Sequence, residues 1–470
     1  MKINKKKLIK SLEIFAILFL IILLYFNGYE AKQTNIIVIL SFIINGIVIV
    51  FNIVLDQSDY SLNKTFWYFN FFFFFIAPLF QYLSSYEMWN FYISDGLYLK
   101  TNLYIVLCYF IYSLSMFFLS KKDKKKKENN IIKDDIINSN MIDNQLKELD
   151  YIYSSNIMIV LLVMSLFSFA FLVLNISFKG LFIRDLNNIS IGDNTTSVIL
   201  ENFFRSIPVY SIVYSIYYYK KKKRGIIFII IELTILIMTN FPTSITRYWV
   251  GLVYIGMILI MFGNKLKDRK FDIILIFIFA VIFPIFQLFK WYSLSDLLNG
   301  ASISQRLFDV YNSVDFDAYS IFCRTIDYVL KNGTELGHQL LASLFFIIPR
   351  AVWITKPYPT GQFIAMSGNQ YFTNISCPLY AEGYVDFGII GSLMYTVIIS
   401  YLIYRADLLY WNNRKNKNDV IIKDYYYPFL FGVLIFMLRG SLQPVVVYSF
   451  TFFIFAFIIK KLCFRKRKLK

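Results

Sequence analysis

The chain has 470 residues, of which 57% are hydrophobic and 17% are charged. This composition is too apolar for a soluble protein of this length and is typical of a polytopic membrane protein. The formal net charge of +18 does not indicate nucleic-acid binding, because the Lys and Arg residues fall almost entirely in alternate connections between apolar stretches.

The apolar stretches predict an all-α fold, a polytopic helical bundle that forms one membrane domain over residues 1–470. A helix needs about 20 mainly apolar residues to cross a bilayer, and the chain has about twelve such candidate spans. They cover roughly residues 8–26, 35–55, 66–83, 102–120, 156–176, 203–219, 225–240, 248–263, 271–291, 389–405, 425–439 and 445–461.

Basic residues cluster near both termini and in every second connection. The clusters are Lys5–Lys7, Lys121–Lys127, Lys220–Arg224, Lys265–Lys270, Arg414–Lys417 and Arg465–Lys468. With twelve spans, each cluster and both termini lie in the cytoplasm, which is the distribution expected of membrane proteins. The charged residues 121–150 then form a cytoplasmic linker.

The connection over residues 292–388 is the largest polar segment, and this topology predicts that it is a large loop outside the cell membrane. Its apolar residues recur at helical spacing, which indicates short interfacial helices. Its two cysteines, Cys323 and Cys377, face an oxidising space, where they either pair or remain free and buried. Within a span, Glu232 is expected to be protonated and hydrogen-bonded inside the bundle.

The large loop gathers Arg350, Trp353 and Lys356 after an apolar stretch. Arg and Lys bind phosphate groups, and Trp offers a flat apolar face on which a sugar ring can stack. The same residue types are also common as anchors at the membrane surface. Composition alone favours neither interpretation.

Three motifs resemble the Wzy-type polymerases that join oligosaccharide repeat units in O-antigen and capsule synthesis. They are Pro349-Arg350-x-x-Trp353-x-x-Lys356-Pro357, Ala381-Glu382-Gly383-Tyr384-x-x-Phe387-Gly388-x-x-Gly391 and Thr243-Ser244-x-x-Arg247. The arrangement of many spans and one long outer loop in the second half is also similar to that family.

The resemblance implies a glycosyltransferase of the bacterial cytoplasmic membrane. Such an enzyme moves a growing glycan from one polyprenyl diphosphate carrier onto a new lipid-linked repeat unit, on the outer face and without a nucleotide sugar. Its partners would be the lipid-linked oligosaccharides, the bilayer and a chain-length regulator protein. No cofactor and no nucleic acid are implied.

The reaction requires cations that stabilise the diphosphate leaving group. We expect Arg247, Arg350, Arg439 and Lys356 to bind it, because the arginines fall at predicted outer ends of spans or in the loop. Arg439 serves equally well as a snorkelling anchor.

A proton acceptor for the sugar hydroxyl is also needed. Glu382 is the first candidate, although an acid here also suits the start of a helix. His338, the only histidine, is the second, because O-antigen ligases have a similar layout with a loop histidine. We expect Trp353 and Tyr384 to contact the sugar.

Asp315-Phe316-Asp317 has the spacing of a metal-binding motif, but two acids so spaced are frequent by chance, and arginines alone can neutralise a diphosphate. We therefore expect no metal. A ligase that transfers finished glycan is the nearest alternative function. A flippase for the same lipid-linked units is another, and it would carry its charges inside the bundle.

Overall fold

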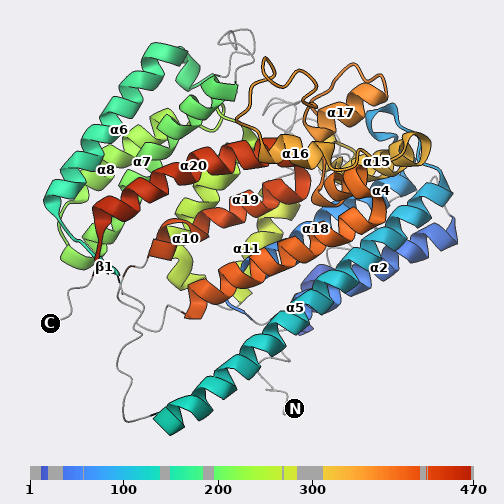
Figure 1. Ribbon diagram of the computed structural model, residues 1–470, viewed down its shortest axis with the longest axis horizontal. Helices are drawn as coiled ribbons and strands as arrows, with labels where there is room; N and C mark the ends of the chain where they lie inside the picture. The colour runs from blue at the N-terminus through green and yellow to red at the C-terminus, as the bar shows by residue number, and fades with distance from the viewer. Residues whose placement is uncertain are drawn as a thin grey trace, which may run out of the picture.

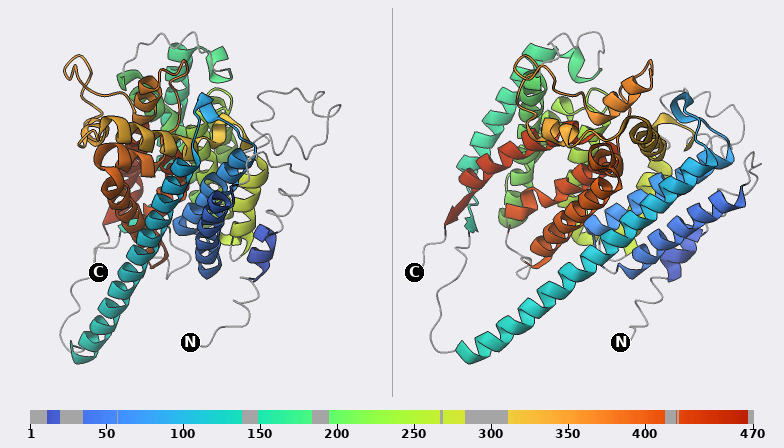
Figure 2. Two further views of the ribbon diagram at one scale, coloured as in Figure 1. Left: turned by 90° about the vertical axis from the view of Figure 1, so that its right-hand side faces the viewer. Right: turned by 45° about the vertical axis from the view of Figure 1, so that its right-hand side comes forward.

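The computed structural model of the protein describes residues 12–19, 35–56, 58–137, 149–183, 195–266, 269–282, 311–412, 420 and 422–466. They form a bundle of long helices with a layer of short helices over one end (Figure 1 and Figure 2). Within these ranges the only strands are β1 (Leu149–Tyr151) and β2 (Phe464–Lys466), which pair in antiparallel fashion. The predicted helical fold class is confirmed.

Most long apolar stretches form one continuous helix. These helices are α2 (Ile36–Leu55), α5 (Asp95–Ile137), α6 (Ser155–Ile176), α7 (Thr195–Lys222), α8 (Ile226–Thr239), α18 (Leu379–Asn412), α19 (Tyr427–Arg439) and α20 (Leu442–Cys463). Three others combine α and π turns: α3 (Leu62–Asn70), η1 (Phe71–Ile76) and α4 (Ala77–Leu83); α9 (Arg247–Val250), η4 (Gly251–Ile255) and α10 (Gly256–Phe262); and α11 (Arg269–Phe277) with η6 (Ile278–Ile282).

Short elements connect the long helices. They are η2 (Met88–Asn90), η3 (Lys179–Leu181), η5 (Gly263–Lys265), η7 (Val314–Phe316), α15 (Ala318–Asn332), α16 (His338–Leu344), α17 (Thr360–Ser367) and η9 (Ile422–Tyr425). Of these, η7 and α15 to α17 belong to the predicted outer loop. We call the end of the bundle that they cover the loop end (Figure 1).

Among the described residues, six helices are long and apolar enough to cross a membrane, and three further apolar helices are shorter. The six cover Ile36–Leu55, Leu62–Leu83, Asp95–Lys124, Ser155–Ile176, Leu379–Asn412 and Leu442–Cys463. The protein is therefore a multi-pass membrane protein by length and composition. The predicted count of twelve spans is not confirmed, and parts of spans 8–26 and 271–291 lie outside the described residues.

The composite helix from Leu62 to Leu83 forms the centre of the bundle. Its whole apolar window is buried, whereas the other candidate spans bury between 22% and 39% of theirs. The π-helical segment η1 consists of Phe71–Phe75 and Ile76, all of which are buried. A helix that is apolar on every side is stable only when it is surrounded. Here the surroundings are protein, and the outer helices expose apolar side chains to the lipid.

The helix α5 extends far beyond its apolar part. It continues through Ile137, so the first half of the predicted linker 121–150 is helical. Between Leu97 and Ile137 the sequence has no Gly or Pro, and its lysines are good helix formers. Residues 138–148 of the predicted linker lie outside the described residues.

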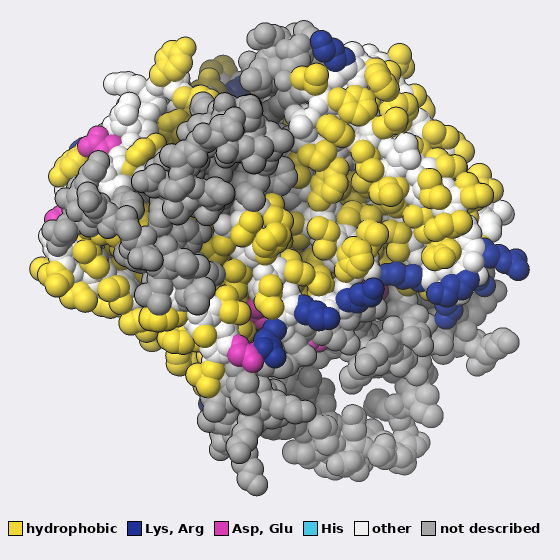
Figure 3. Space-filling model, turned by 180° about the vertical axis from the view of Figure 1, so that it is seen from behind, with side chains coloured by type: hydrophobic (Ala, Val, Ile, Leu, Met, Phe, Trp, Pro, Cys, Tyr) yellow, Lys and Arg dark blue, Asp and Glu magenta, His cyan; other side chains and the backbone are white. Residues whose placement is uncertain are grey.

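The end opposite α15 to α17, which we call the basic end, carries Lys and Arg at helix termini. These include Lys220–Lys222 in the last turn of α7, and Lys460 and Lys461 in that of α20. Nζ of Lys220 donates a hydrogen bond to the carbonyl of Ile260 at 3.0 Å, so α7 and α10 end together. In Figure 3, a row of Lys and Arg side chains borders the apolar surface. Such a row is typical of the boundary between lipid and water.

The helix α18 begins ten residues earlier than the predicted span 389–405, at Leu379, and contains a kink. At the kink, Phe387 has φ −140° and ψ 20°, and Gly388 has φ 62° and ψ −150°. The segments on either side pack so closely that a Cβ on Gly391 would lie 1.9 Å from the carbonyl oxygen of Gly383. The motif glycines therefore allow a short helix to fold back on a long one.

Two predictions about buried polar groups have clear outcomes. Cys323 and Cys377 are both free and buried, and burial raises the pKa of Cys323 to about 12 and that of Cys377 well above its usual range. Both thiols therefore stay neutral and unreactive near pH 7. Glu232 is fully buried as expected, but neither carboxylate oxygen has a hydrogen-bond partner among the described residues. The Ser165 side chain of α6 nevertheless interacts with this carboxyl group, so the predicted internal partner is present without ideal hydrogen-bond geometry.

Candidate functional site

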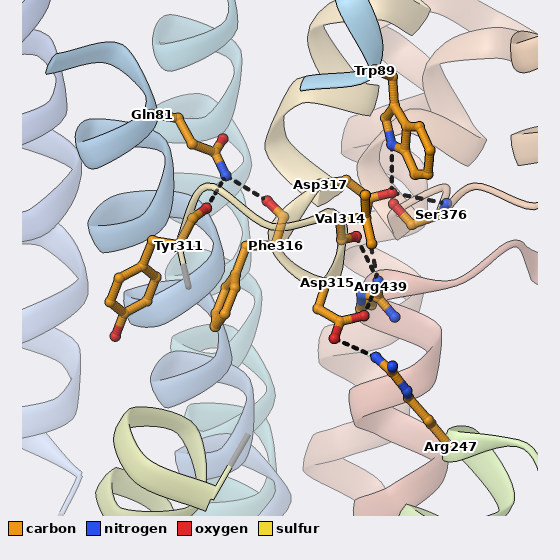
Figure 4. A network of polar contacts seen from close by, with 10 residues as sticks. All are labelled: Gln81, Trp89, Arg247, Tyr311, Val314, Asp315, Phe316, Asp317, Ser376 and Arg439. Atoms are coloured by element: carbon orange, nitrogen blue, oxygen red, sulfur yellow. Dashed lines mark hydrogen bonds and ion pairs between the residues drawn. The ribbon is translucent and has the colours of Figure 1, made fainter. Parts of the chain in front are cut away.

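Two arginines and two aspartates meet at the loop end of the bundle. Arg247 is the first residue of α9, and Arg439 is the last residue of α19. Asp315 lies in η7, and Asp317 immediately precedes α15. Figure 4 shows that these four side chains, from three distant parts of the sequence, converge. We call them the arginine–aspartate cluster.

Asp315 bridges the two guanidinium groups. Its Oδ2 accepts a hydrogen bond from Nη1 of Arg247, and its Oδ1 lies 3.7 Å from Nη2 of Arg439. The same Nη2 donates to the carbonyl of Val314 at 3.1 Å. Each carboxylate oxygen of Asp315 faces one arginine. A single anion in this position can therefore reach both guanidinium groups.

Asp317 ties the cluster to the surrounding loops. Its Oδ2 accepts hydrogen bonds from Nε1 of Trp89 at 3.1 Å and from the backbone N–H of Ser376 at 3.3 Å. Its Oδ1 accepts one from Nη2 of Arg439 at 3.5 Å. This carboxylate therefore has protein donors on both oxygens and holds Arg439 in place.

The backbone of η7 is fixed from the opposite side. Nε2 of Gln81 donates to the carbonyls of Tyr311 and Phe316, at 2.7 Å and 3.0 Å (Figure 4). The ring of Phe316 is buried against those of Phe73 and Tyr311, with centroids 4.9 Å and 4.8 Å apart. These contacts hold the segment while Asp315 points toward the arginines.

The arginines of the cluster face outward and the acids face inward. The side chains of Arg247 and Arg439 are 52% and 26% exposed, whereas those of Asp315 and Asp317 are 7% and 1% exposed. Within the described part of the chain, Nε of Arg439 has no hydrogen-bond partner. An anion that approaches from outside therefore meets the guanidinium groups first.

Glu382, predicted as the catalytic base, is buried away from solvent. Its Oε1 accepts a hydrogen bond from the backbone N–H of Leu442 at 2.8 Å, and its Oε2 accepts one from Oγ1 of Thr360 at 2.7 Å. Leu442 is the first residue of α20, whose free N–H groups and dipole favour a carboxylate. The geometry suits a positioning role and leaves no exposed oxygen to receive a proton from a sugar.

A second group of loop-end residues consists of His338 and Trp353, whose rings contact each other, and Arg350, which precedes Trp353 by three residues and contacts Tyr358 instead. The His338 and Trp353 rings are 5.8 Å apart, and both side chains are partly exposed. The guanidinium of Arg350 lies 3.9 Å from the centre of the Tyr358 ring and donates to the carbonyl of Pro357 at 3.0 Å. This group thus combines a cation with flat rings.

Lys356, predicted to bind the diphosphate, is instead buried beneath this surface. Its Nζ donates to the carbonyls of Phe346 and Ile348 at 2.9 Å and 2.8 Å, just beyond the end of α16. Burial lowers the pKa of the Lys356 ammonium, and the charge of Arg350 lowers it further. With these acceptors, Lys356 stabilises the turn that follows α16.

Tyr384, predicted to contact sugar, lies in the core. Its ring packs between those of Tyr104 and Phe322, with centroids 5.6 Å and 5.9 Å away. The structure therefore separates the predicted residues. Arg247 and Arg439 converge, Arg350, Trp353 and His338 form a separate group, and the rest are internal.

The carboxylates of Asp315 and Asp317 face arginines. Among the described residues there is no group of three or more His, Cys, Asp and Glu side chains that could hold a metal ion. The sequence offered Asp315 and Asp317 as a possible metal motif because of their D-x-D spacing. In the structure, both aspartates are partners of arginines.

Some members of the site carried no usable sequence signal. Trp89 lies 228 residues before Asp317, and Gln81 lies 230 residues before Tyr311. Neither belongs to a motif.

Comparison of the chain with protein-family models, with curated proteins and with solved structures finds no match.

Proposed function

We propose that the protein is a membrane glycosyltransferase that polymerises polyprenyl-diphosphate-linked oligosaccharide repeat units for O-antigen or capsule synthesis. The observation that carries this proposal is the convergence of Arg247 and Arg439 at one end of an apolar bundle. In the reaction, the bond between the sugar and the donor diphosphate breaks. The glycan then joins a hydroxyl of the next lipid-linked unit.

The position of the arginine–aspartate cluster suits a lipid headgroup. Arg247 begins one apolar helical segment and Arg439 ends another, which supports a place for both arginines at the boundary between lipid and water. A departing diphosphate develops negative charge, which fixed guanidinium groups stabilise strongly in a partly dry site. The polyprenyl tail would lie along the apolar surface of the bundle.

We assign the second group, Arg350, Trp353 and His338, to the glycan. A sugar ring can stack on the Trp353 face, and the imidazole of His338 can take the proton of the acceptor hydroxyl. Glu382, the other candidate base, then acts as a positioning residue, because it connects α18 to the starts of α17 and α20.

The proposal includes a location and an orientation. We place the protein in the bacterial cytoplasmic membrane with twelve spans, with the basic end and both termini in the cytoplasm and the loop end outside. The row of basic side chains at one end supports this orientation. A chain-length regulator protein would contact the enzyme from the outer side.

Two other functions use the same headgroup. A ligase would hand finished glycan to a different acceptor, and the loop position of His338 is compatible with that activity. A flippase would need its charges along a path inside the bundle. Arg247, Arg350 and Arg439 instead gather at one end, which favours a transferase.

The test in cells compares surface glycan from the gene deletion with glycan from strains that carry Arg247→Ala or Arg439→Ala. We expect each variant to keep single-unit glycan and lose the polymer. Lys331→Ala is the control, because Lys331 is exposed at the loop end and its ion-pair partner within the described ranges is Asp327, at 2.6 Å. Normal polymer in both arginine variants would contradict the proposal. Units trapped on the inner leaflet would instead indicate a flippase.

A further inference from the structure

The helix α16 turns polar side chains into the protein and apolar side chains outward. Gln339 and Ser343 are at most 2% exposed, whereas Leu341 and Leu344 are 46% and 59% exposed. A helix that lies between a protein core and water has the opposite arrangement. The outer face of α16 is therefore suited to an apolar medium.

The turn after α16 continues this apolar surface, because Phe345 and Ile347 are 51% and 61% exposed. We propose that residues 341–347 form a re-entrant segment, which enters the bilayer from the loop end and contacts lipid acyl chains. The inference goes beyond the proposed function and does not depend on it, because it concerns only the medium around this segment.

The first argument is that the re-entrant segment is continuous with the apolar surface of α20. The helices α16 and α20 pack together at the loop end (Figure 1). The ring centroids of Phe346 and Phe450 are 5.3 Å apart, and the Phe450 side chain is exposed. Phe450 lies roughly two helical turns, or about 12 Å, beyond Leu442, the first residue of α20. The re-entrant segment thus lies beside a candidate membrane span and past its first turn.

The second argument is that Lys356 supplies what a non-helical turn needs inside a bilayer. Carbonyls beyond the end of a helix find no water there, so such a turn is stable only where protein groups donate to them. Nζ of Lys356 donates to the carbonyls of Phe345, Phe346 and Ile348, at 3.4 Å, 2.9 Å and 2.8 Å. The re-entrant segment therefore accounts for a lysine that is buried under an apolar turn.

The third argument is that the chain next passes through residues typical of the headgroup level. The guanidinium of Arg350 lies over the ring of Tyr358, and the ring of Trp353 contacts that of His338. Trp and Tyr rings and snorkelling Arg side chains are common where acyl chains meet headgroups. The re-entrant segment would hold His338, the first residue of α16, at the same level.

The experiment places single cysteines on the re-entrant segment and labels them with a fluorophore that reports polarity. All four native cysteines are buried, so the label attaches at the introduced one. The full-length protein is placed in nanodiscs that hold one copy and either ordinary or acyl-brominated phosphatidylcholine. We expect labelled Leu344→Cys and Ile347→Cys to lose most of their emission in brominated lipid and to resist quenching by acrylamide in the buffer. Leu341→Cys serves if either variant does not fold.

Two positions calibrate the signals. Ile47 is exposed on α2, a candidate membrane span, so Ile47→Cys should behave like the re-entrant segment. Asn332 is exposed at the last residue of α15, so Asn332→Cys should be quenched by acrylamide and not by brominated lipid.

The outcomes are distinct. If both positions behave like Asn332, the segment faces water and the proposal is overturned. Protection from both quenchers would mean that another part of the chain covers the segment, and this result overturns the proposal too. Either result leaves the proposed function standing, because that function is tested by the size of the surface glycan.

Discussion

Buried carboxylates in this protein complete helices to which they do not belong. Asp386 accepts from the backbone N–H groups of Gln339 and Leu340 at the start of α16, at 3.1 Å and 2.9 Å. Glu382 does the same for Leu442 in α20. Neither helix has a side-chain cap from its own N-cap residue. Where water is scarce, such free N–H groups need a partner.

The first prediction concerns Glu382. Glu382→Ala should lower the free energy of unfolding by about 1 to 3 kcal/mol, because it leaves the Leu442 N–H without its acceptor and the Thr360 hydroxyl with only the longer contact to Oε1 of Gln339, at 3.4 Å. Glu382→Gln keeps one acceptor oxygen and should retain most stability and activity. Thermal unfolding in detergent and polymer sizing measure the two effects. A folded Gln variant with turnover reduced by about 10² or more would return Glu382 to the role of base.

The second prediction contrasts two neighbouring cations. Lys356→Met should destabilise the loop end, because it leaves the carbonyls of Phe346 and Ile348 without a donor. Arg350→Ala should keep the fold and lose polymer, and Arg350→Lys should restore only part of it, since the planar fork is lost. Proteolysis of the loop and glycan sizing distinguish these effects. Full polymer in Arg350→Ala would make Arg350 an interfacial anchor.

At the scale of elements, the kink in α18 lies within the motif that runs from Ala381 to Gly391 and positions the acids of that motif. Its short first segment carries Glu382 and Asp386, and Gly388 reverses the chain so that this segment packs on the longer one. From the sequence, the motif was predicted to lie in the loop before a span. The length of the apolar stretch predicted the span 389–405, but it did not predict that the helix begins at Leu379. Its polar first turns are stabilised by contacts with α16, α17 and α20, which the local sequence does not reveal.

The third prediction tests this packing. Gly391→Ala should cost about 1 to 3 kcal/mol of stability and reduce activity, because the new Cβ would overlap the Gly383 carbonyl and push the first segment away. Gly96→Ala is the control, since a Cβ there meets no atom within 4 Å. Thermal unfolding of both variants is the measurement. Equal stability in the two would mean that the close approach is not needed.

At the scale of the whole molecule, the sequence predicted the long helices well and their assembly poorly. Apolar windows identify spans because bilayer thickness sets their length. The arginine–aspartate cluster depends on contacts such as Arg247 with Asp315, 68 residues apart, which no local pattern encodes. The outward position of Arg247 and Arg439 was predictable, because both stand at the ends of apolar helices.

The fourth prediction concerns orientation. Asp95, the first residue of α5, accepts a hydrogen bond from Nδ2 of Asn35 at 2.7 Å. From there the helix runs toward the basic end (Figure 1). Reporters fused after Lys126 and after Asn312 should therefore give opposite signals, inside and outside. The same signal at both positions would overturn the proposed orientation.

The most direct measurement is polymer formation by purified protein in liposomes that contain one polyprenyl-diphosphate-linked oligosaccharide and no nucleotide sugar. We predict a ladder of longer lipid-linked glycans, with one free polyprenyl diphosphate released for each bond formed. Arg439→Ala should abolish both signals, and Lys331→Ala should change neither. Movement of the oligosaccharide across the bilayer with no new glycosidic bond would contradict the account.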